Sequence, residues 1–583
     1  MASVSKPFPP SIPARKPASL APHPGLEVVL EPRSPMGTGT ARAGVLSLLE
    51  RAALWRALFV ALCLVTFAGM GAVYLLSLTN YLSVEGDNAI YIILGKALAT
   101  GHGYMNIQGS VPRIESQYPP LFPLLLAPLV RVWGTDGVAQ MQALVAGFAL
   151  ASLALSFFLF RRWLGSAVLA FATVLAAASS DLIWEFSHKV LTEIPYLFFT
   201  LLACWWASDY AAQPRWLTRA GTLAVLAAVA AFMTRTIGLS ICAMLPLYLL
   251  LGPPIWLRDG DWRLRLAKAG WATLLLTLLV GAWTLRNRIV YSGQGHTYIG
   301  QFFLKQTYVP DAGQISVSAD DLLTRASKAV DYYGGVYQRM IVGHLWDRIP
   351  ERADFSQALL AITVLGFLYA LIRRRTLAEF YLLGYVGIVL LWPWTDLRFA
   401  VPILPFLIYY IACALLPPMI LLARFRQLDP RVATAMLLLP LFIPSGDHTV
   451  RTALHDRELG FHYELERLGE WPAYQDWRNF HAAAVWLQAN AVPGSTVINR
   501  SPNIFYLWTG MHSRNYPYSH DLAYMLSDIS HEHNDYVIDD RFSWTYTTGL
   551  YLEPVLRAYK DRFFGPFSVP DAHDTKVYQV VGS

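Results

Sequence analysis

Long stretches without charged residues recur along most of the chain, separated by short segments rich in arginine. The first such stretch runs from Ala57 to Val84, and others follow down to about Gly446. A helix of about 20 apolar residues crosses the roughly 30 Å hydrocarbon layer of a membrane. The pattern therefore predicts about eleven spanning helices, at residues 57–80, 137–160, 163–180, 190–208, 220–234, 236–257, 269–285, 355–372, 380–395, 399–423 and 432–446.

Basic residues beside these segments predict how the chain is oriented in the membrane. If the N-terminus is cytoplasmic, every second boundary should be basic, because arginine and lysine gather on the cytoplasmic side. The basic groups that fit this expectation are Arg161 and Arg162, Arg215 and Arg219, Arg258 to Lys268, Arg373 to Arg375, and Arg424 to Arg431. We therefore expect a multi-pass protein with a cytoplasmic N-terminus and an extracytoplasmic C-terminus.

Composition supports a membrane protein and excludes several other classes. Hydrophobic residues make up 55% of the 583 residues and charged residues only 15%, and the mean hydropathy is +0.37. All four cysteines lie in apolar segments, so the sequence predicts no disulfide framework and no thiolate metal site. A lack of cysteines outside the apolar segments and of an endoplasmic-reticulum retention signal favours a plasma (inner) membrane.

The chain divides into three expected parts. Residues 1–50 are rich in Pro, Ala and Ser and are expected to form a disordered cytoplasmic tail. Residues 51–446 form the expected transmembrane domain, with external loops at 81–136 and 286–354 that are long enough to carry function. Residues 447–583 are expected to form an extracytoplasmic α/β domain, because β-branched runs at 495–499, 535–539 and 575–581 alternate with helical patterns near 477–490, 519–529 and 549–562.

Two helices are predicted inside the first external loop. Apolar residues recur at helical spacing between Ile90 and Leu98 with polar residues elsewhere on the wheel, which favours a helix lying on the membrane surface. A second surface helix is predicted after two prolines, from Leu121 to Trp133.

Carboxylates and arginines on the external side are the candidates for chemistry. Glu85 and Asp87 follow the first predicted span, where a carboxylate can serve as a general base; the alternative is that they complement a helix dipole. Glu193 lies just inside an apolar segment, where a carboxylate is costly and a functional role is the first expectation, with pairing to Lys189 as the alternative.

Three arginines lie on the expected external side, against the positive-inside trend. They are Arg235, Arg286 and Arg398. Guanidinium groups bind phosphate oxygens in bidentate fashion, so these residues are candidates for holding a phosphate. The alternatives are ordinary interfacial arginines and, for Arg398, a partner for Asp396.

Three sequence motifs resemble loops of the GT-C glycosyltransferase superfamily, in particular the branch of dolichyl-phosphate-mannose protein mannosyltransferases, aminoarabinose transferases and their bacterial relatives. The first is Glu85-Gly86-Asp87-Asn88-Ala89-Ile90-Tyr91, followed by Gly101-His102-Gly103-Tyr104 and by Gln117-Tyr118-Pro119-Pro120. The others are the runs 187–193 and 398–405. The family often has His-Pro-Pro where this chain has Tyr118 before the prolines.

The resemblance implies a fold, an activity and a set of site residues. It implies a polytopic α-helical GT-C-like protein that transfers a sugar from a polyprenyl-phosphate donor to an extracytoplasmic lipid, glycan or protein acceptor, with inversion. The implied catalytic residues are Asp87 as the base or metal-linked carboxylate, then Glu85 and Glu193. The implied substrate-binding residues are Tyr91, Tyr118, Lys189, Arg235, Arg286 and Arg398.

Several points remain open at the level of sequence. No particular cofactor is indicated by the sequence, and a divalent metal ion is an alternative to Arg398 for stabilising the phosphate. The chain has no glycine-rich nucleotide-binding motif, which favours a lipid-linked donor, and nothing predicts a nucleic-acid partner. The competing functions are a transporter or flippase of lipid-linked saccharides and a non-catalytic GT-C-like scaffold.

Overall fold

A computed structural model describes most of the chain. The described residues are 38–79, 81–84, 87–252, 262–290, 298–303, 317–342, 353–425, 428–459, 475–531 and 534–581. The chain forms two compact units, Met1–Leu64 and Val65–Ser583. The loops, the cavity and the C-terminal strands all belong to the second unit. The predicted tail at 1–50 lies mostly outside the described residues.

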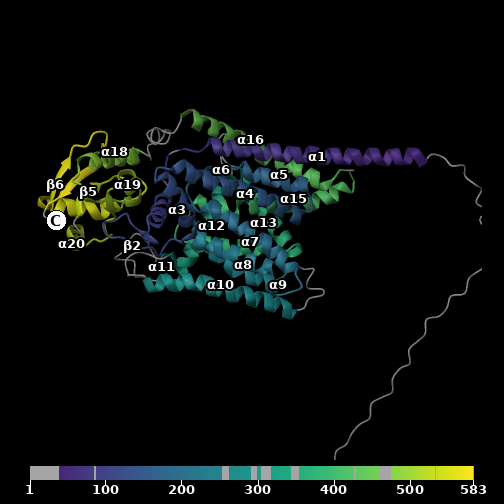
Figure 1. The fold of residues 1–583 in the computed structure, drawn as a ribbon, viewed down its shortest axis with the longest axis horizontal. Coiled ribbons are helices and arrows are strands. Elements are labelled where there is room, and N and C mark those ends of the chain that lie inside the picture. Colours follow the sequence, from purple (N-terminus) through teal and green to yellow (C-terminus); the bar gives the residue numbers. More distant parts are fainter. Residues whose placement is uncertain are drawn as a thin grey trace, which may run out of the picture. The chain divides into compact units, whose positions relative to one another are not determined.

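Most of the described residues are helical, and several helices are long and apolar enough to cross a membrane (Figure 1). Within the described part of the chain, five helical segments meet this requirement by length and composition, and a bent pair makes a sixth candidate. The five are Ala53–Leu76 within α1 (Thr38–Leu76), α4 (Val138–Leu164), α10 (Trp262–Val290), Asp354–Arg373 within α13 (Ala353–Arg373), and Leu397–Ala423, formed by η5 (Leu397–Ile403) and α15 (Leu404–Ala423). The chain is therefore a multi-pass membrane protein.

The other predicted spans correspond to shorter, broken or longer helices. The predicted span 163–180 is broken into α5 (Ala167–Ala178) and α6 (Asp181–Ser187), which are bent by 66°. Predicted span 432–446 is part of a longer helix, α16 (Pro430–Leu459), which continues past the predicted domain boundary at 447. The remaining helices here are α7 (Glu193–Ala212), α8 (Arg219–Thr234), η1 (Thr236–Gly238), α9 (Leu239–Leu251) and α14 (Leu377–Leu391). The number eleven stays a prediction.

The first loop differs from the expectation at its first helix. Helix α2 (Asn88–Ala99) has nine of its twelve residues buried, including Ile92, Ile93 and Leu94, so it is packed inside the protein rather than exposing a polar face on a membrane surface. The expectation was wrong because other segments cover this helix, among them Tyr506, a residue more than 400 positions away that packs against Ile93 and Ala97. Helix α3 (Leu121–Trp133) has the predicted bounds, and a short hairpin of β1 (Met105–Asn106) and β2 (Arg113–Ile114) lies between them.

The second long loop contributes two helices, α11 (Tyr298–Phe303) and α12 (Ala319–Val342). Helix α12 fixes the segment before α15, because the hydroxyl of Tyr333 donates to the backbone carbonyl of Asp396 at 3.1 Å. At the end of α10, Asn287 Nδ2 donates to the carbonyl of Ser116 at 3.0 Å. Both loops are thereby tied to the apolar helices.

A mixed five-stranded sheet with helices forms what we call the C-terminal region, residues 475–581. The strands are β3 (Thr496–Ile498), β4 (His512–Arg514), β5 (Asn534–Asp539), β6 (Phe563–Phe567) and β7 (Lys576–Val580), in the order β4-β3-β5-β7-β6. Strand β3 is parallel to β4 and β5, whereas β7 is antiparallel to β5 and β6. The helical elements are α18 (Gln475–Asn490), α19 (Pro502–Thr509), α20 (Leu522–His531), η7 (Thr548–Leu552), α21 (Glu553–Ala558) and η8 (Lys560–Arg562). The predicted strands β3, β5 and β7 are confirmed, while β4 and β6 were not predicted.

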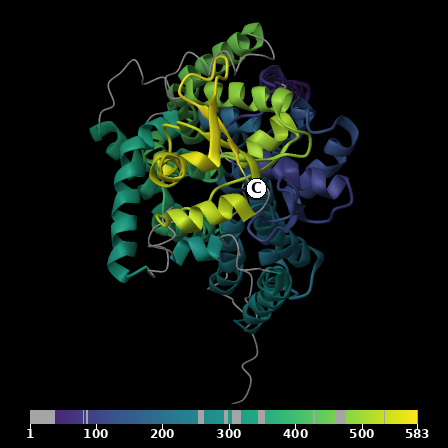
Figure 2. The same ribbon diagram turned by 90° about the vertical axis from the view of Figure 1, so that its left-hand side faces the viewer.

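The C-terminal region is fastened to the first loop. In Figure 1 its elements lie next to β2 and α3, and Figure 2 shows them in yellow in front of the helices. Ser513 N donates to the carbonyl of Gln108 at 2.8 Å, and Lys96 Nζ donates to the hydroxyl of Tyr506 at 3.1 Å. Residues of the first loop and of the C-terminal region, about 400 positions apart in the sequence, therefore meet beside α2.

Candidate active site

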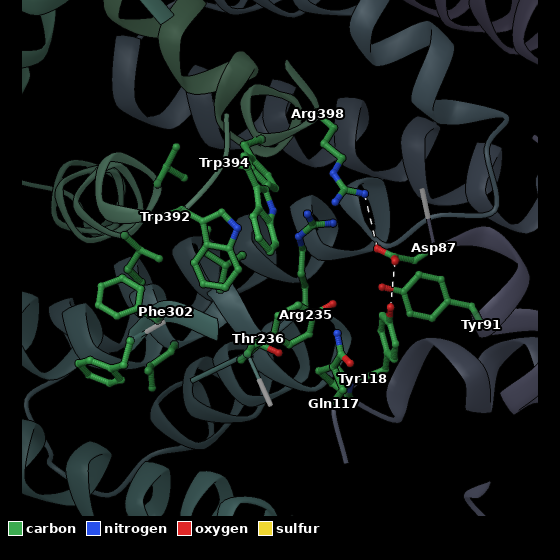
Figure 3. A pocket seen from close by; sticks show the side chains of 18 of the residues that line it. Asp87, Tyr91, Gln117, Tyr118, Arg235, Thr236, Phe302, Trp392, Trp394 and Arg398 are labelled. Carbon is green, nitrogen blue, oxygen red and sulfur yellow. Dashed lines mark hydrogen bonds and ion pairs between the residues drawn. The ribbon is translucent and has the colours of Figure 1, made fainter. Parts of the chain in front are cut away.

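A cavity of about 720 Å³ opens where the first loop, the second loop, the apolar helices and the C-terminal region meet (Figure 3). Its wall has a charged and hydroxyl-bearing part and an apolar, aromatic part. The polar part is formed by Asp87, Tyr91, Gln117, Tyr118, Arg235, Thr236, Arg398, Asn515 and Tyr518, and the apolar part includes Ile237, Leu239, Phe302, Phe303, Ile388, Val389, Trp392, Trp394 and Phe399.

Asp87 lies at the centre of the polar wall. It is the residue that precedes α2, yet its side chain makes no capping hydrogen bond to that helix. Its carboxylate instead accepts a hydrogen bond from the Tyr118 hydroxyl at 2.9 Å and lies 3.5 Å from Arg398 Nη1. With 27% of its side chain exposed, the carboxylate is accessible from the cavity while its two neighbours fix its orientation. Figure 3 shows Tyr118 and Arg398 on either side of it.

The loop before Tyr118 is held from two sides. Glu115 accepts backbone hydrogen bonds from Gln117 and Tyr118 at 2.6 and 3.1 Å, and Tyr104 donates to the carbonyl of Tyr118 at 2.8 Å. Burial raises the pKa of Glu115. Burial, and then the charge of Asp87, raises the pKa of Tyr118 well above its ordinary value, so its hydroxyl stays a hydrogen-bond donor.

Arg398 is oriented by the residue that begins its own short helix. Asp396 accepts the backbone N–H of Arg398 at 2.9 Å and pairs with its Nε at 3.2 Å. The pairing with Asp396 that the sequence offered as an alternative therefore exists, but it leaves the far side of the guanidinium directed at Asp87.

Arg235 is the second arginine of the cavity and is held by Glu193. Arg235 Nη1 lies 2.5 Å from Glu193 Oε1 and donates to Thr192 Oγ1 at 3.1 Å. The Glu193 side chain is only 1% exposed and does not line the cavity, so it contacts Arg235 from behind. The guanidinium groups of Arg235 and Arg398 lie 5.7 Å and 5.4 Å from the centre of the Phe399 ring, so two cations lie beside one aromatic ring.

Tyr91 joins this group from the first turn of α2. Its ring meets that of Tyr118 edge to face at 5.4 Å, and its hydroxyl lies 3.4 Å from Thr192 Oγ1. The structure thus brings five of the residues proposed from the sequence together around one cavity, namely Asp87, Tyr91, Tyr118, Arg235 and Arg398.

Two residues predicted to bind substrate lie elsewhere. Lys189 pairs with Glu185 at 2.6 Å, four residues earlier, and it is not part of the cavity wall. Arg286 is also outside the wall; its Nη1 donates to the carbonyl of Glu115 and its guanidinium lies 4.9 Å from the ring of Trp283. Arg286 therefore supports the loop before Tyr118 rather than the cavity itself. Glu85 lies outside the described residues.

Sequence reasoning missed the aromatic wall and the contribution of the C-terminal region. Trp392 and Trp394 precede Arg398 by a few residues, and this Trp-Pro-Trp run was the available signal. Tyr298 packs against both Tyr118 at 5.9 Å and Trp392 at 6.1 Å, joining the two parts of the wall. For Asn515 and Tyr518 the sequence carried no signal that we recognise.

The described residues do not fit a metal site at this cavity. They contain no group of three or more His, Cys, Asp or Glu that could hold a metal ion. Asp87 is the acidic residue among the described lining residues, and two arginines share the same wall. Mg²⁺ and Ca²⁺ take six or more oxygen ligands, and the two positive guanidinium groups repel a divalent cation. The divalent ion that the sequence offered as an alternative to Arg398 stays a prediction.

Comparison with solved structures finds several proteins that align with most of this chain. ArnT from Cupriavidus metallidurans bound to undecaprenyl phosphate aligns over 91% of this chain and 99% of its own, at 13% identity and a TM-score of 0.53. The archaeal oligosaccharyltransferase AglB from Archaeoglobus fulgidus, in complex with an inhibitory peptide and a dolichol-phosphate, aligns over 86% of this chain and 72% of its own, at 12% identity and a TM-score of 0.53. The Archaeoglobus fulgidus oligosaccharyltransferase tethered to an acceptor peptide matches with the same coverage, at 14% identity and a TM-score of 0.51.

This chain has the fold of these membrane proteins. Both ArnT and AglB belong to the GT-C superfamily, so the resemblance predicted from the loop motifs is confirmed at the level of the fold. No family model and no curated protein sequence matches the chain. At such low identity the likeness concerns the fold alone, and function has to be argued from the cavity.

Proposed function

We propose that this protein is a glycosyltransferase that transfers a sugar from a polyprenyl-phosphate donor to an extracytoplasmic acceptor, in a plasma (inner) membrane. The observation that carries the proposal is the position of Asp87, a carboxylate held between a tyrosine hydroxyl and an arginine in the wall of a large cavity. The bound undecaprenyl phosphate of ArnT and the dolichol-phosphate of AglB support a lipid-phosphate donor for a chain of the same fold.

Arg235 and Arg398 supply the positive charge for the donor phosphate. Each guanidinium is permanently charged and presents a planar fork that matches phosphate oxygens. Because Glu193 and Asp396 already hold their inner sides, both arginines are oriented before substrate arrives. The apolar wall around Trp392 and Phe302 suits the first isoprene units or the face of the sugar ring.

The chemical step is a single displacement at the anomeric carbon. Asp87 takes the proton of the acceptor hydroxyl as its oxygen attacks the anomeric carbon, and the bond from that carbon to the phosphate oxygen breaks. Polyprenyl phosphate leaves with the bonding electrons, and the negative charge that it gains is stabilised by the two arginines. Attack from the face opposite the leaving group inverts the anomeric centre.

The test is turnover of a panel of radiolabelled polyprenyl-phosphate sugars by the purified protein in lipid nanodiscs. We expect wild type to hydrolyse or transfer at least one donor. Asp87→Asn should bind that donor and lose activity by about 10²- to 10⁴-fold, the usual contribution of a general base. Asp136→Asn is the matched control, because Asp136 is exposed and outside the cavity wall.

Two results would contradict the proposal. If Asp87→Asn turned over the donor at the wild-type rate, Asp87 would not be the base. If the folded wild-type protein turned over no donor of the panel, the proposed transfer would be wrong, and a transporter or a non-catalytic scaffold would be the favoured function.

A further inference from the structure

The C-terminal sheet changes the direction of its connections at β3. The chain leaves β3 through α19 to reach β4 on one side, and returns through α20 to β5 on the other side. In open sheets with parallel strands, ligands bind outside the carboxyl ends of the strands where the connections diverge in this way. The residues that follow β3, β4 and β5 are therefore the place in this region to look for a ligand site.

Three side chains from these strand ends form a stack. Arg500 follows β3, Tyr518 lies in the segment after β4, and Trp544 lies in the segment after β5. The Arg500 guanidinium is 5.4 Å from the centre of the Tyr518 ring and 4.7 Å from that of Trp544. We call these three residues the Arg500 stack.

The Arg500 stack is held rigidly by the loops around it. Arg500 Nε donates to Thr547 Oγ1 at 3.0 Å, and its backbone N–H donates to the buried Asp540 at 3.1 Å. Trp544 lies nearly parallel to Trp477 of α18, with 10° between the ring planes. A site whose parts are fixed in advance loses less conformational entropy when it binds a ligand.

The stack connects the surface of the C-terminal region with the cavity. Tyr518 lines the cavity together with Asn515, whose Nδ2 donates to the Tyr518 hydroxyl at 2.9 Å. At the other end of the stack, the Trp544 side chain is 50% exposed, so part of its ring is open to solvent. A ligand that reaches Asp87 from outside can therefore extend along Tyr518 towards Trp544.

We infer that the Arg500 stack is a subsite for a saccharide part of the acceptor. This inference rests on the proposed glycosyl transfer and deepens it by naming the acceptor class. A sugar ring has one apolar face of C–H groups, which packs on an aromatic ring, and an edge of hydroxyl groups, which accept hydrogen bonds from guanidinium N–H donors. A polar rim around an aromatic platform suits a glycan better than it suits a lipid tail.

The experiment measures saccharide binding without requiring turnover. Saturation-transfer difference NMR is recorded on the full-length protein in nanodiscs with a panel of disaccharides, namely maltose, cellobiose and chitobiose, and donor hydrolysis is measured separately. At least one disaccharide should bind the wild type. Trp544→Ala and Arg500→Gln should raise the Kd for that disaccharide at least about tenfold, a loss of roughly 1.4 kcal/mol in binding free energy. The rate of donor hydrolysis should stay within about twofold of wild type.

Matched variants separate binding from folding. Tyr546→Ala removes an aromatic ring that is 81% exposed in the same segment but outside the stack, and it should bind as wild type does. Trp544→Phe keeps an aromatic face and should recover most of the binding lost in Trp544→Ala.

Each outcome decides between the two proposals. Absence of binding by all three disaccharides, or equal binding by Trp544→Ala, would overturn the saccharide subsite. Saccharide binding that depends on Trp544, in a protein that turns over no donor, would support the subsite and refute the proposed transfer.

Discussion

Tyr118→Phe isolates the hydrogen bond that orients the candidate base. The substitution removes one hydroxyl group, which donates to Asp87 at 2.9 Å. It leaves the ring, whose edge-to-face contacts with Tyr91 at 5.4 Å and Tyr298 at 5.9 Å do not involve the hydroxyl. Any change in activity then reports on the contact with Asp87 rather than on packing.

The expected size follows from the nature of this hydrogen bond. A hydrogen bond to a charged group contributes about 1.5–3 kcal/mol. Asp87 is 27% exposed, so water partly replaces the lost donor and the lower end of that range applies. Roughly 1.5 kcal/mol corresponds to about a tenfold loss in kcat. The donor KM should change less than about twofold, because Arg235 and Arg398 are untouched.

The assay is steady-state transfer of the radiolabelled donor, with kcat and KM determined separately. Tyr91→Phe is the matched control: it also removes a tyrosine hydroxyl from the cavity wall, but that hydroxyl lies 3.4 Å from Thr192 and not against Asp87. We expect the control to lose less than about threefold in kcat. The reasoning is refuted if both variants lose activity equally, or if Tyr118→Phe raises the donor KM and leaves kcat unchanged.

Three further predictions concern the surroundings of the site. Glu193→Gln should raise the donor KM about tenfold with little change in kcat, because it removes the negative charge that lies 2.5 Å from Arg235. Equal donor KM values for wild type and variant would show that Arg235 needs no such partner. Gly366→Ala should prevent folding, since its Cβ would lie 1.8 Å from the backbone oxygen of Tyr410, and size-exclusion chromatography of the detergent-solubilised variant would show aggregation. Burial raises the pKa of Asp540 to about 7 from 3.8, so its charge destabilises the C-terminal region above pH 7 and this penalty is relieved as the pH falls towards 4. Hydrogen exchange in residues 534–558 should therefore reveal fewer opening events at pH 5.5 than at pH 8 after correction for the intrinsic rate. Asp540→Asn should reduce the difference without removing it, because burial also raises the pKa of the neighbouring Asp539, to about 6.

Part of the site was predictable because its residues are close in the sequence. Asp87, Tyr91 and Tyr118 lie within one loop, and the sequence motif of that loop was enough to identify them as candidate site residues. Arg235 and Arg398 were candidates because a basic residue on the external side breaks the charge pattern of the spans. Local spacing and charge bias are properties that a single sequence shows directly.

The ion-pair partners of charged residues and the burial of α2 were less predictable, because they depend on contacts between distant segments. Glu193 was expected to be catalytic or to pair with Lys189, but it pairs with Arg235, 42 residues away. Lys189 pairs instead with Glu185, four residues earlier, a partner that the sequence analysis did not consider. The burial of α2 could not be read from its own periodicity, because other segments cover it, among them Tyr506, which packs against Ile93 and Ala97.

The attachment of the C-terminal region to the first loop has a consequence for protein engineering. Tyr506 covers part of α2, and the hydrogen bond from Ser513 to Gln108 closes the outer edge of β4. Deleting the C-terminal region would remove Tyr506 from Ile93 and Ala97, leaving Met105 and Ile107 of the first loop as their other neighbours in this cluster, and would weaken the packing of the helix that begins beside Asp87. A truncated transmembrane fragment should therefore have a less ordered first loop as well as no C-terminal region, whereas a cysteine crosslink between positions 108 and 513 should be tolerated.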